Sequence, residues 1–317
     1  MTTPLGFLYT EGARADPVTP LLWFVLIVSL LVVTVVAALL VAGARRDAAS
    51  TVSSHAVPVR REQGGLRPIV IGLIVSLALL LASLGWTLVA LGQVLTPPRR
   101  LRIEIDVTAH QWWWQADYAA TAAAQAFTTA NELHIPVGEP VLVRLHGGDV
   151  IHSFWVPRLS GKTDAIPGQV NQTWLQADHP GRYAGQCSEY CGAQHAHMGF
   201  IVVADTPAQY AQWRRAQLQT APPPATPAQV HGLALFQNRC ALCHAARGTL
   251  AGSRYGPDLS HLFSRKTIAA GTLPLTRGSL AGWIEDPQAA KPEARMPPQQ
   301  FSGEDLQDLL TYLEMLR

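Results

Sequence analysis

The sequence predicts a multidomain membrane protein in which a two-helix transmembrane hairpin precedes an all-β domain and a separate C-terminal domain. Three observations predict it: two long uncharged apolar segments near the start, short alternating apolar runs in the middle, and a Pro-rich stretch at 220–227 before the last segment. A net charge of +2 over 317 residues excludes a protein that binds nucleic acid through its overall charge. The 15% share of charged residues fits a chain anchored in a membrane.

The predicted hairpin covers residues 19–96, after an N-terminal segment at 1–18. Thr19–Gly43 runs 25 residues and Ile69–Leu95 runs 27, both without a charge, and a bilayer span needs about 20. This length disfavours the alternative, a buried hairpin of a soluble protein. The first 18 residues lack a basic start followed by a short apolar run, so no cleavable signal peptide is expected.

The connection between the two spans sets the predicted orientation. It carries five arginines against two acids: Arg45, Arg46, Arg60, Arg61 and Arg67 against Asp47 and Glu62. The positive-inside rule therefore places this connection in the cytoplasm. Both chain ends, and the domains that follow the hairpin, are then expected outside the cell membrane.

Residues 97–205 have the pattern of a β domain. Leu101, Ile103, Ile105 and Val107 alternate with charged residues, which is the period of a half-buried strand. Further strand-like runs, separated by turns that contain Gly or Pro, are Val141 to Leu145, Ser153 to Val156 and Phe200 to Val203. This spacing predicts a β-sandwich or barrel.

The stretch CSEYCGAQHAHM in this domain gathers sulfur and nitrogen donors. Cys187, Cys191 and Met198 offer soft sulfur and His195 offers borderline nitrogen, so the set selects copper or zinc over magnesium, calcium or manganese. The methionine favours copper, because a weak thioether is typical of electron-transfer copper, and the alternative is a zinc knot. His152, just ahead of the strand-like SFWVP, is placed to reach the same loop.

The other two of the four cysteines lie in the pentapeptide CALCH, a c-type haem attachment motif. Thioether bonds from Cys240 and Cys243 would hold the porphyrin, and His244 would supply one axial ligand to the iron. Of the four methionines, Met296 lies in the loop-like ARMPP segment and is the candidate for the other axial ligand. The alternatives for CALCH are a chance CxxC or half of a zinc site, but no second CxxC follows it.

The two outer domains are joined by residues 206–227. TPAQYAQWRRAQLQ at 206–219 has helical character, and TAPPPATP at 220–227 is a Pro-rich tether, extended and semi-rigid. The last domain is therefore expected at residues 228–317.

Residues 19–205 resemble subunit II of the haem-copper cytochrome c oxidases. Four blocks carry the resemblance in order: AHQWWW at 109–114, VIHSFWVP, KTDAIPGQVNQT at 162–173, and GQCSEYCGAQHAHM. The resemblance implies two membrane helices and a cupredoxin domain that holds a binuclear copper A centre. The implied copper ligands are the imidazoles of His152 and His195, the bridging thiolates of Cys187 and Cys191, the weakly bound thioether of Met198, and the carbonyl of Glu189.

The same resemblance implies further roles. The Glu189 side chain reaches a magnesium ion at the contact with subunit I, and Trp112 resembles the tryptophan at which electrons enter. Trp113 and Trp114 fit an aromatic belt or an ordinary core. Asp149 corresponds to an acidic position that helps dock cationic cytochrome c, but we do not count it as a site residue.

The remaining histidines are expected to be surface or packing residues: His55, His110, His134, His146, His179, His231 and His261. His197 lies inside the copper loop, but the family pattern skips that position, so it is expected not to bind metal.

Residues 228–317 resemble a class I cytochrome c. The matching features are a helix that leads into CALCH, the segment GPDLSHLF, a helix around Trp283, the Met296 loop and a closing helix near 304–316. The resemblance implies an all-α domain with covalent haem c. It also implies that the carbonyl of Pro257 accepts a hydrogen bond from His244.

Together the resemblances imply the electron-input subunit of a bacterial terminal oxidase. The implied partners are the membrane, subunits I and III, and a donor such as cytochrome c or another respiratory complex. Electrons would pass from haem c to copper A and on to subunit I, where oxygen is reduced to water and protons are pumped. Two alternatives stay open: the input subunit of a copper A-type nitric oxide reductase, and a non-catalytic periplasmic copper or redox carrier.

Overall fold

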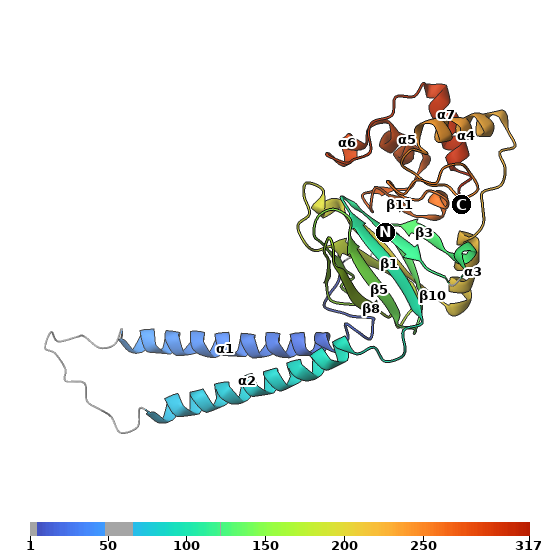
Figure 1. Ribbon diagram of the computed structural model, residues 1–317. Helices are drawn as coiled ribbons and strands as arrows, with labels where there is room; N and C mark the ends of the chain where they lie inside the picture. Colours follow the sequence, from blue (N-terminus) through green and yellow to red (C-terminus); the bar gives the residue numbers. More distant parts are fainter. Residues whose placement is uncertain (1–4, 48–65, 121) are drawn as a thin grey trace. The chain divides into compact units, whose positions relative to one another are not determined.

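The computed structural model describes residues 5–47, 66–120 and 122–317 (Figure 1). It divides into two compact units, one of residues 16–96 and one that joins the N-terminal segment up to residue 15 to residues 97–317. The first unit is a pair of apolar helices, and the second contains a β-sandwich and a helical domain. The predicted fold class is confirmed.

The helix pair consists of α1 (Val18–Asp47) and α2 (Leu66–Leu95). Both are long and apolar enough to cross a membrane, with a mean hydropathy of 3.2 over an 18-residue window of Val18–Arg45 and of 2.5 over such a window of α2. Hydroxyl groups inside them donate back to helix carbonyls, as Ser83 does to Leu79 at 2.7 Å, so these polar groups are satisfied within the helix. Part of the connection that predicts the orientation, with Arg60, Arg61, Glu62 and His55, lies outside the described residues.

Two five-stranded sheets form the sandwich. The first has the order β3 (Phe127–Ala130), β2 (Trp113–Tyr118), β1 (Ile103–His110), β5 (Val141–Gly147), β8 (Val170–Leu175). The second has the order β4 (Glu132–Pro136), β10 (Gly199–Asp205), β9 (Gly181–Cys187), β6 (His152–Trp155), β7 (Thr163–Ala165). β1 pairs in parallel with β5 and antiparallel with β2, so the first sheet is mixed and not a simple antiparallel meander.

The alternating pattern of β1 places its apolar residues in the core. Ile105, Val107 and Ala109 are fully buried, while the residues between them are partly exposed. Trp114 fills the centre of the sandwich and packs edge-on against Phe154, with ring centroids 5.7 Å apart. Burying one such side chain stabilises the fold by about 1.5–3 kcal/mol.

The N-terminal segment packs on the sandwich. The Glu11 carboxylate pairs with Arg158 and accepts a hydrogen bond from the Tyr183 hydroxyl at 2.9 Å. Gly12 lies so close to the chain that a Cβ there would be 2.4 Å from the Gln176 carbonyl oxygen. These contacts place residues before α1 in the same unit as the sandwich.

The linker helix and the first helix of the last domain start in the same way. α3 (Pro207–Gln217) and α4 (Pro227–Arg239) each begin at the proline of a TPAQ tetrapeptide, whose threonine, Thr206 or Thr226, is the N-cap. In each, the threonine side chain accepts from the glutamine backbone N–H and the glutamine side chain reaches back, with proline at the first helical position. The repeated tetrapeptide is a capping box used twice.

The last domain also contains α5 (Arg277–Glu285), α6 (Pro287–Ala290) and α7 (Gly303–Leu313). α4 crosses α7 closely at Gly232, where a Cβ would be 2.1 Å from the Asp308 carbonyl oxygen. A small hairpin of β11 (Thr267–Ile268) and β12 (Leu273–Pro274) adds to the expected helices. α7 ends at Leu313, a little before the end of the closing helix expected near 304–316.

Candidate metal centre

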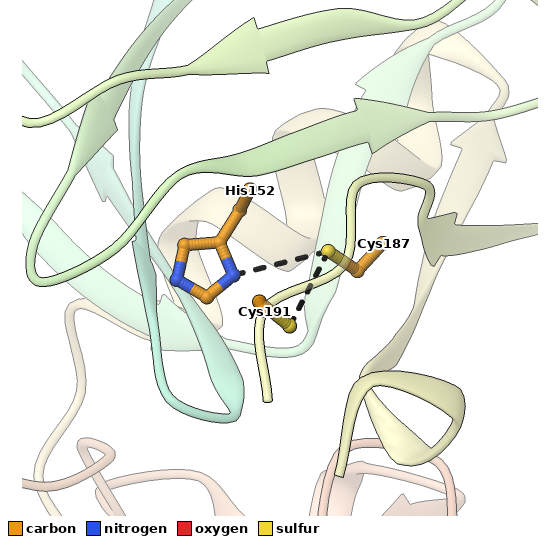
Figure 2. A group of neighbouring side chains, drawn as sticks. All are labelled: His152, Cys187 and Cys191. Carbon is orange, nitrogen blue, oxygen red and sulfur yellow. Dashed lines mark hydrogen bonds between the residues drawn. The ribbon is translucent and has the colours of Figure 1, made fainter. Parts of the chain in front are cut away.

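The copper motif lies where β6, β9 and β10 meet. His152 is the first residue of β6 and not, as expected, the residue before the strand, and Cys187 is the last residue of β9. The two strands are antiparallel neighbours, with Phe154 opposite Cys187. Figure 2 shows the His152 ring turned toward the Cys187 sulfur, with the sulfur of Cys191 beside it.

The sulfur atoms form the middle of the site. The Sγ atoms of Cys187 and Cys191 are 3.8 Å apart, and the Nδ1 atom of His152 is 3.8 Å from the Cys187 sulfur. Ligand atoms of these three buried residues all lie within 4.8 Å of one another. The fold brings His152 next to Cys187, although the two are 35 residues apart in the sequence.

Three more donors surround the pair of sulfurs. The Nδ1 atom of His195 lies 3.6 Å and the Met198 sulfur 3.8 Å from the Cys191 sulfur. The carbonyl oxygen of Glu189 lies 3.3 Å from the Cys187 sulfur. All six predicted copper ligands are thus in one cluster.

The loop reaches this shape through Gly192 and a short helical turn. Gly192 has φ +113°, a conformation that favours glycine, and a Cβ there would be 3.0 Å from the Trp112 ring. The turn His195–His197 follows, and Met198 leads directly into β10. The loop is therefore fixed at both ends by strands, which holds the donors in place.

The donor set fits two soft or borderline metal ions that share two thiolates. One histidine and one weaker donor lie next to each sulfur: His152 and the Glu189 carbonyl beside Cys187, and His195 and Met198 beside Cys191. The thioether and the two thiolates favour copper over magnesium or calcium. A single tetrahedral zinc would leave part of this set unused.

The two thiols are electrostatically coupled. The hydrogen bond with Cys191 lowers the pKa of Cys187 to about 3, and the same contact raises the pKa of Cys191. Two adjacent thiols cannot both ionise easily, so one proton stays in the pair. A metal ion replaces that proton, because only thiolates bind it.

Asp149 orients His152. Its Oδ1 atom is 2.8 Å from the Nε2 atom of His152, and its Oδ2 atom accepts from the backbone N–H of Gln111 at 2.7 Å. Burial raises the pKa of Asp149, but the hydrogen bonds with His152, Gln111 and Val150 outweigh it and lower the pKa to about 2. Burial lowers the pKa of His152, but Asp149 and Cys187 outweigh it and raise the pKa. The carboxylate therefore leaves Nδ1 facing the sulfurs.

The sequence analysis assigned no site role to Asp149. The available signal was its position three residues before His152, a carboxylate within reach of a candidate metal-binding imidazole. Such a partner is common beside metal-binding histidines.

Trp112 lies between the copper loop and the protein surface. It is 7% exposed, and its Nε1–H donates to the Cys191 carbonyl at 3.0 Å. Trp114 is a core residue, and Trp113 stacks on His110 with ring centroids 4.6 Å apart. Of the three tryptophans, Trp112 is the one that contacts the backbone of a predicted copper ligand and still reaches solvent.

Glu189 presents its carboxylate away from the sulfurs. The side chain is 44% exposed and lies 3.6 Å from the Lys162 ammonium.

His197, which the family pattern skips, contacts the Gln194 side chain through Nδ1 at 2.7 Å. His134 is buried, with Nδ1 2.6 Å from Asp205 and Nε2 3.3 Å from Glu132, so both of its ring nitrogens face carboxylates.

The haem motif follows α4. Cys240 caps this helix, and Cys243 and His244 lie in the turn after it. The Nδ1 atom of His244 contacts the Pro257 carbonyl at 2.7 Å, the contact that the resemblance implies. Burial lowers the pKa of His244, which favours the neutral ring that binds iron. The Nε2 atom is then the ring nitrogen that could bind a metal ion.

The second axial candidate, Met296, packs against the core of the same domain, as does Cys240. Its carbonyl lies 3.4 Å from the Gln288 side-chain nitrogen, a contact that ties the Met296 loop to α6. The structure places Met296 in a segment without helix or strand, as its sequence indicated.

Two family models match parts of the chain. The family model described as "Cytochrome C oxidase subunit II, periplasmic domain" matches residues 119–205, and the model described as "Cytochrome c" matches residues 229–317. Residues 119–205 are thus similar to the periplasmic domain of cytochrome c oxidase subunit II, and residues 229–317 are similar to cytochrome c. The first family implies copper and the second implies haem c.

Curated relatives carry the same name. "Cytochrome c oxidase subunit 2" of Alkalihalophilus pseudofirmus is 40% identical over 217 residues, 68% of this chain and 61% of the relative. The protein of that name from Bacillus sp. strain PS3 is 31% identical over 227 residues, 68% of this chain and 62% of the relative. The chain thus matches about three fifths of each relative's length.

One solved structure is similar to part of the chain. The periplasmic domain of subunit II of cytochrome oxidase from Bradyrhizobium japonicum is 31% identical, with a TM-score of 0.35, covering 38% of this chain and 95% of that domain.

Proposed function

We propose that this chain is the electron-input subunit of a bacterial terminal oxidase. A donor reduces haem c, electrons pass to a binuclear copper A centre, and subunit I reduces oxygen to water with proton pumping. The observation that carries the proposal is the convergence of six copper-type donors in a chain that also has a haem attachment motif.

In this proposal six residues hold the copper pair: His152, Cys187, Glu189 through its carbonyl, Cys191, His195 and Met198. A copper pair bridged by two thiolates spreads one added electron over both metals and both sulfurs, so that bond lengths change little and transfer is fast. The chain holds the donors at fixed positions between β9 and β10 and keeps water away, since both cysteines and Met198 are buried. Asp149 orients the His152 ring.

Cys240 and Cys243 would hold the porphyrin, and His244 and Met296 would bind its iron. Bound haem c supplies reversible one-electron chemistry, and a methionine ligand raises its reduction potential. Two protein ligands leave no open position for oxygen. We therefore expect that the isolated chain reduces no oxygen and that the oxygen-reducing site lies in another subunit.

Two further roles belong to the proposal. Trp112 is the residue at which electrons enter the copper domain, supported by its hydrogen bond to the Cys191 carbonyl. The exposed Glu189 carboxylate contributes to a magnesium ion shared with subunit I. A single carboxylate cannot fill an octahedral magnesium site, so the partner and water supply the other ligands.

The proposed location is the bacterial cell membrane, with α1 and α2 spanning it and both outer domains in the periplasm. The support is the length and hydropathy of the two helices and the match to a periplasmic domain. The proposed partners are subunits I and III of the oxidase and a donor such as cytochrome c or another respiratory complex. No contact with nucleic acid is proposed.

Metal analysis and spectroscopy of the full chain in detergent test the proposal. We expect two coppers and one haem per chain, with the near-infrared band and the electron spin resonance signal of mixed-valence copper. One copper, or zinc in its place, contradicts it.

Activity of the purified complex separates the remaining alternatives. Oxygen consumption supports an oxidase, whereas nitric oxide consumption without oxygen consumption identifies a nitric oxide reductase. A chain that purifies with copper but without a large catalytic subunit from its native membrane is a carrier.

A further inference from the structure

The segment before Met296 contacts the copper domain through a buried lysine. Lys291 is 3% exposed, although lysine is rarely buried without a charged partner. Its ammonium donates to the Trp112 carbonyl at 2.7 Å and to the Ala269 carbonyl at 3.3 Å. One acceptor belongs to the copper domain and the other to the haem domain, so the amine joins the two.

Burial of this amine has an energetic cost. Burial lowers the pKa of Lys291 to about 7, although the nearby Cys191 acts in the opposite direction and raises that pKa. A lysine at a domain surface reaches water without such a cost. Here two carbonyl oxygens at the contact between the domains replace the water that the Nζ atom loses, and these hydrogen bonds offset part of the free energy lost on burial.

A second cation of the same segment makes a charged contact. The Nη2 atom of Arg295 donates to the Gln111 side-chain oxygen at 3.1 Å and lies 3.4 Å from the Asp149 carboxylate. Arg295 is half exposed, whereas the carboxylate is 12% exposed. Lys291 and Arg295 therefore contact two adjacent residues of the copper domain, Trp112 and Gln111.

From both acceptors, hydrogen bonds continue to predicted copper ligands. Trp112 Nε1–H and the Gln111 side-chain amide donate to the Cys191 carbonyl at 3.0 and 2.8 Å. The Asp149 carboxylate that faces Arg295 also holds His152. Each cation is thus one residue away from a residue that the proposal gives to copper.

A third contact lies beside Met198. The backbone N–H of Gly199 donates to the Ala270 carbonyl of the haem domain at 3.0 Å. Ala270 has φ +57° and Ala269 φ +53°, and the Ala269 carbonyl is the second acceptor of Lys291. The lysine therefore also fixes the turn that covers Gly199.

We propose that Lys291 and Arg295 are positioning residues that hold the haem domain on the Trp112 surface of the copper domain. This inference rests on the proposed function. The transfer that they position moves one electron from reduced haem to the oxidised copper pair, with no bond made or broken and no proton moved. The fused domain then occupies the surface at which electrons enter, so a free donor reduces the haem and not the copper.

Amide hydrogen exchange of the full chain, loaded with copper and haem, tests the docking itself. We expect Lys291→Met, which keeps the apolar stem, to speed exchange of the Gly199 amide roughly tenfold, as expected for the loss of a hydrogen bond from a charged group. Lys266→Met is the matched control, because Lys266 is an exposed lysine of the same domain. Unchanged Gly199 exchange in Lys291→Met overturns the proposal.

Rapid mixing with a small reduced dye measures the functional consequence. Lys291→Met and Arg295→Gln should slow haem-to-copper transfer roughly tenfold while haem reduction by the dye, the haem potential and the copper spectrum stay unchanged. Arg295→Lys keeps the charge and should recover most of the rate. Salt should slow the unmodified chain but not Arg295→Gln, since the Arg295–Asp149 contact is partly exposed.

The two proposals fail in different ways. A chain without paired copper, or one whose reduced haem never reduces copper, defeats the proposed function while Gly199 exchange still reports the docking. A chain with normal transfer in both variants defeats the positioning role while the proposed function stands.

Discussion

Two predicted ligand histidines are held in opposite ways. His152 contacts the Asp149 carboxylate through Nε2, leaving Nδ1 for the sulfur cluster, whereas His244 contacts the Pro257 carbonyl through Nδ1, leaving Nε2. The first partner is charged and the second is neutral. Burial lowers the pKa of both rings: at His152 the contacts with Asp149 and Cys187 outweigh burial and raise the pKa, whereas at His244 burial outweighs the hydrogen bond with Pro257 and the pKa is lowered.

The difference separates the tasks of the two sites. The neutral Pro257 carbonyl fixes the direction of the His244 ring and adds no net charge to the buried surroundings of this ligand. A carboxylate also makes the imidazole a stronger donor and puts a charge near the surface. In this chain that charge is shared with Arg295, so the orientation of a copper ligand and the docking of the haem domain use the same side chain.

The two sites also differ in how their donors are supported. Cys187, Cys191 and Met198 are buried in the sandwich core, and their sulfurs contact one another. Cys240, Cys243 and Met296 are partly exposed, and Cys240 and Met296 pack against the helical core. The copper donors are therefore organised by the fold, while haem, when attached, adds to the apolar packing of its own domain.

The largest expected effect comes from Cys187→Ser. A hydroxyl cannot bridge two coppers as a thiolate does, so we predict complete loss of the near-infrared band of mixed-valence copper. Haem c should remain attached and reducible, because its residues lie in a separate core. Absorption spectra of the purified chain check both, and a surviving near-infrared band removes Cys187 from the bridging role.

The converse change is the double substitution Cys240→Ser with Cys243→Ser. Without thiols no thioether bond forms, so we predict no haem that survives denaturing electrophoresis. Copper content should stay unchanged. The haem domain should unfold at lower temperature, since the porphyrin no longer packs beside Cys240 and Met296. Loss of copper together with haem contradicts the independence of the two sites.

Local patterns in the sequence predicted much of this fold and most of the candidate copper ligands. Three patterns predict structure from nearby residues alone: the uncharged runs, the alternation at Ile105 and Val107, and CALCH. They can do so because helix length, strand period and haem attachment are local properties. Even the loop CSEYCGAQHAHM holds five of the six predicted copper ligands, all but His152, within a dozen residues.

What the sequence did not show depends on contacts between distant segments. Lys291 and Trp112 are 179 residues apart, and nothing near Lys291 indicates that it is buried. The role of Asp149 required knowing that β1 ends beside it, so that the Gln111 N–H reaches its carboxylate. The β11–β12 hairpin is too short for a period to be read.

The next effect tests the carboxylate that holds His152. Asp149→Asn keeps a hydrogen-bond acceptor but removes the charge, and we predict roughly 10–100-fold weaker copper binding. Competition with a chelator, in the full chain, measures this. Asp106→Asn is the control, because Asp106 contacts His146 at 3.0 Å in a partly exposed pair. Equal copper affinity for both variants refutes the charge argument.

The smallest effect concerns His134, whose two ring nitrogens face carboxylates and which stacks on Trp213 of the linker helix with ring centroids 4.1 Å apart. Burial lowers the pKa of His134, but the contacts with Asp205 and Glu132 outweigh it and raise the pKa above its ordinary 6.5. The charged ring therefore stabilises the fold below pH 6.5, and this stabilisation is lost as pH rises through the raised pKa. We predict that His134→Gln makes the unfolding temperature of the sandwich depend less on pH between about 6 and 8, with a slope flatter than that of the unmodified chain. His146→Gln serves as control, and a slope unchanged in His134→Gln shows that a histidine with both nitrogens engaged is held by packing on Trp213 and not by its charge.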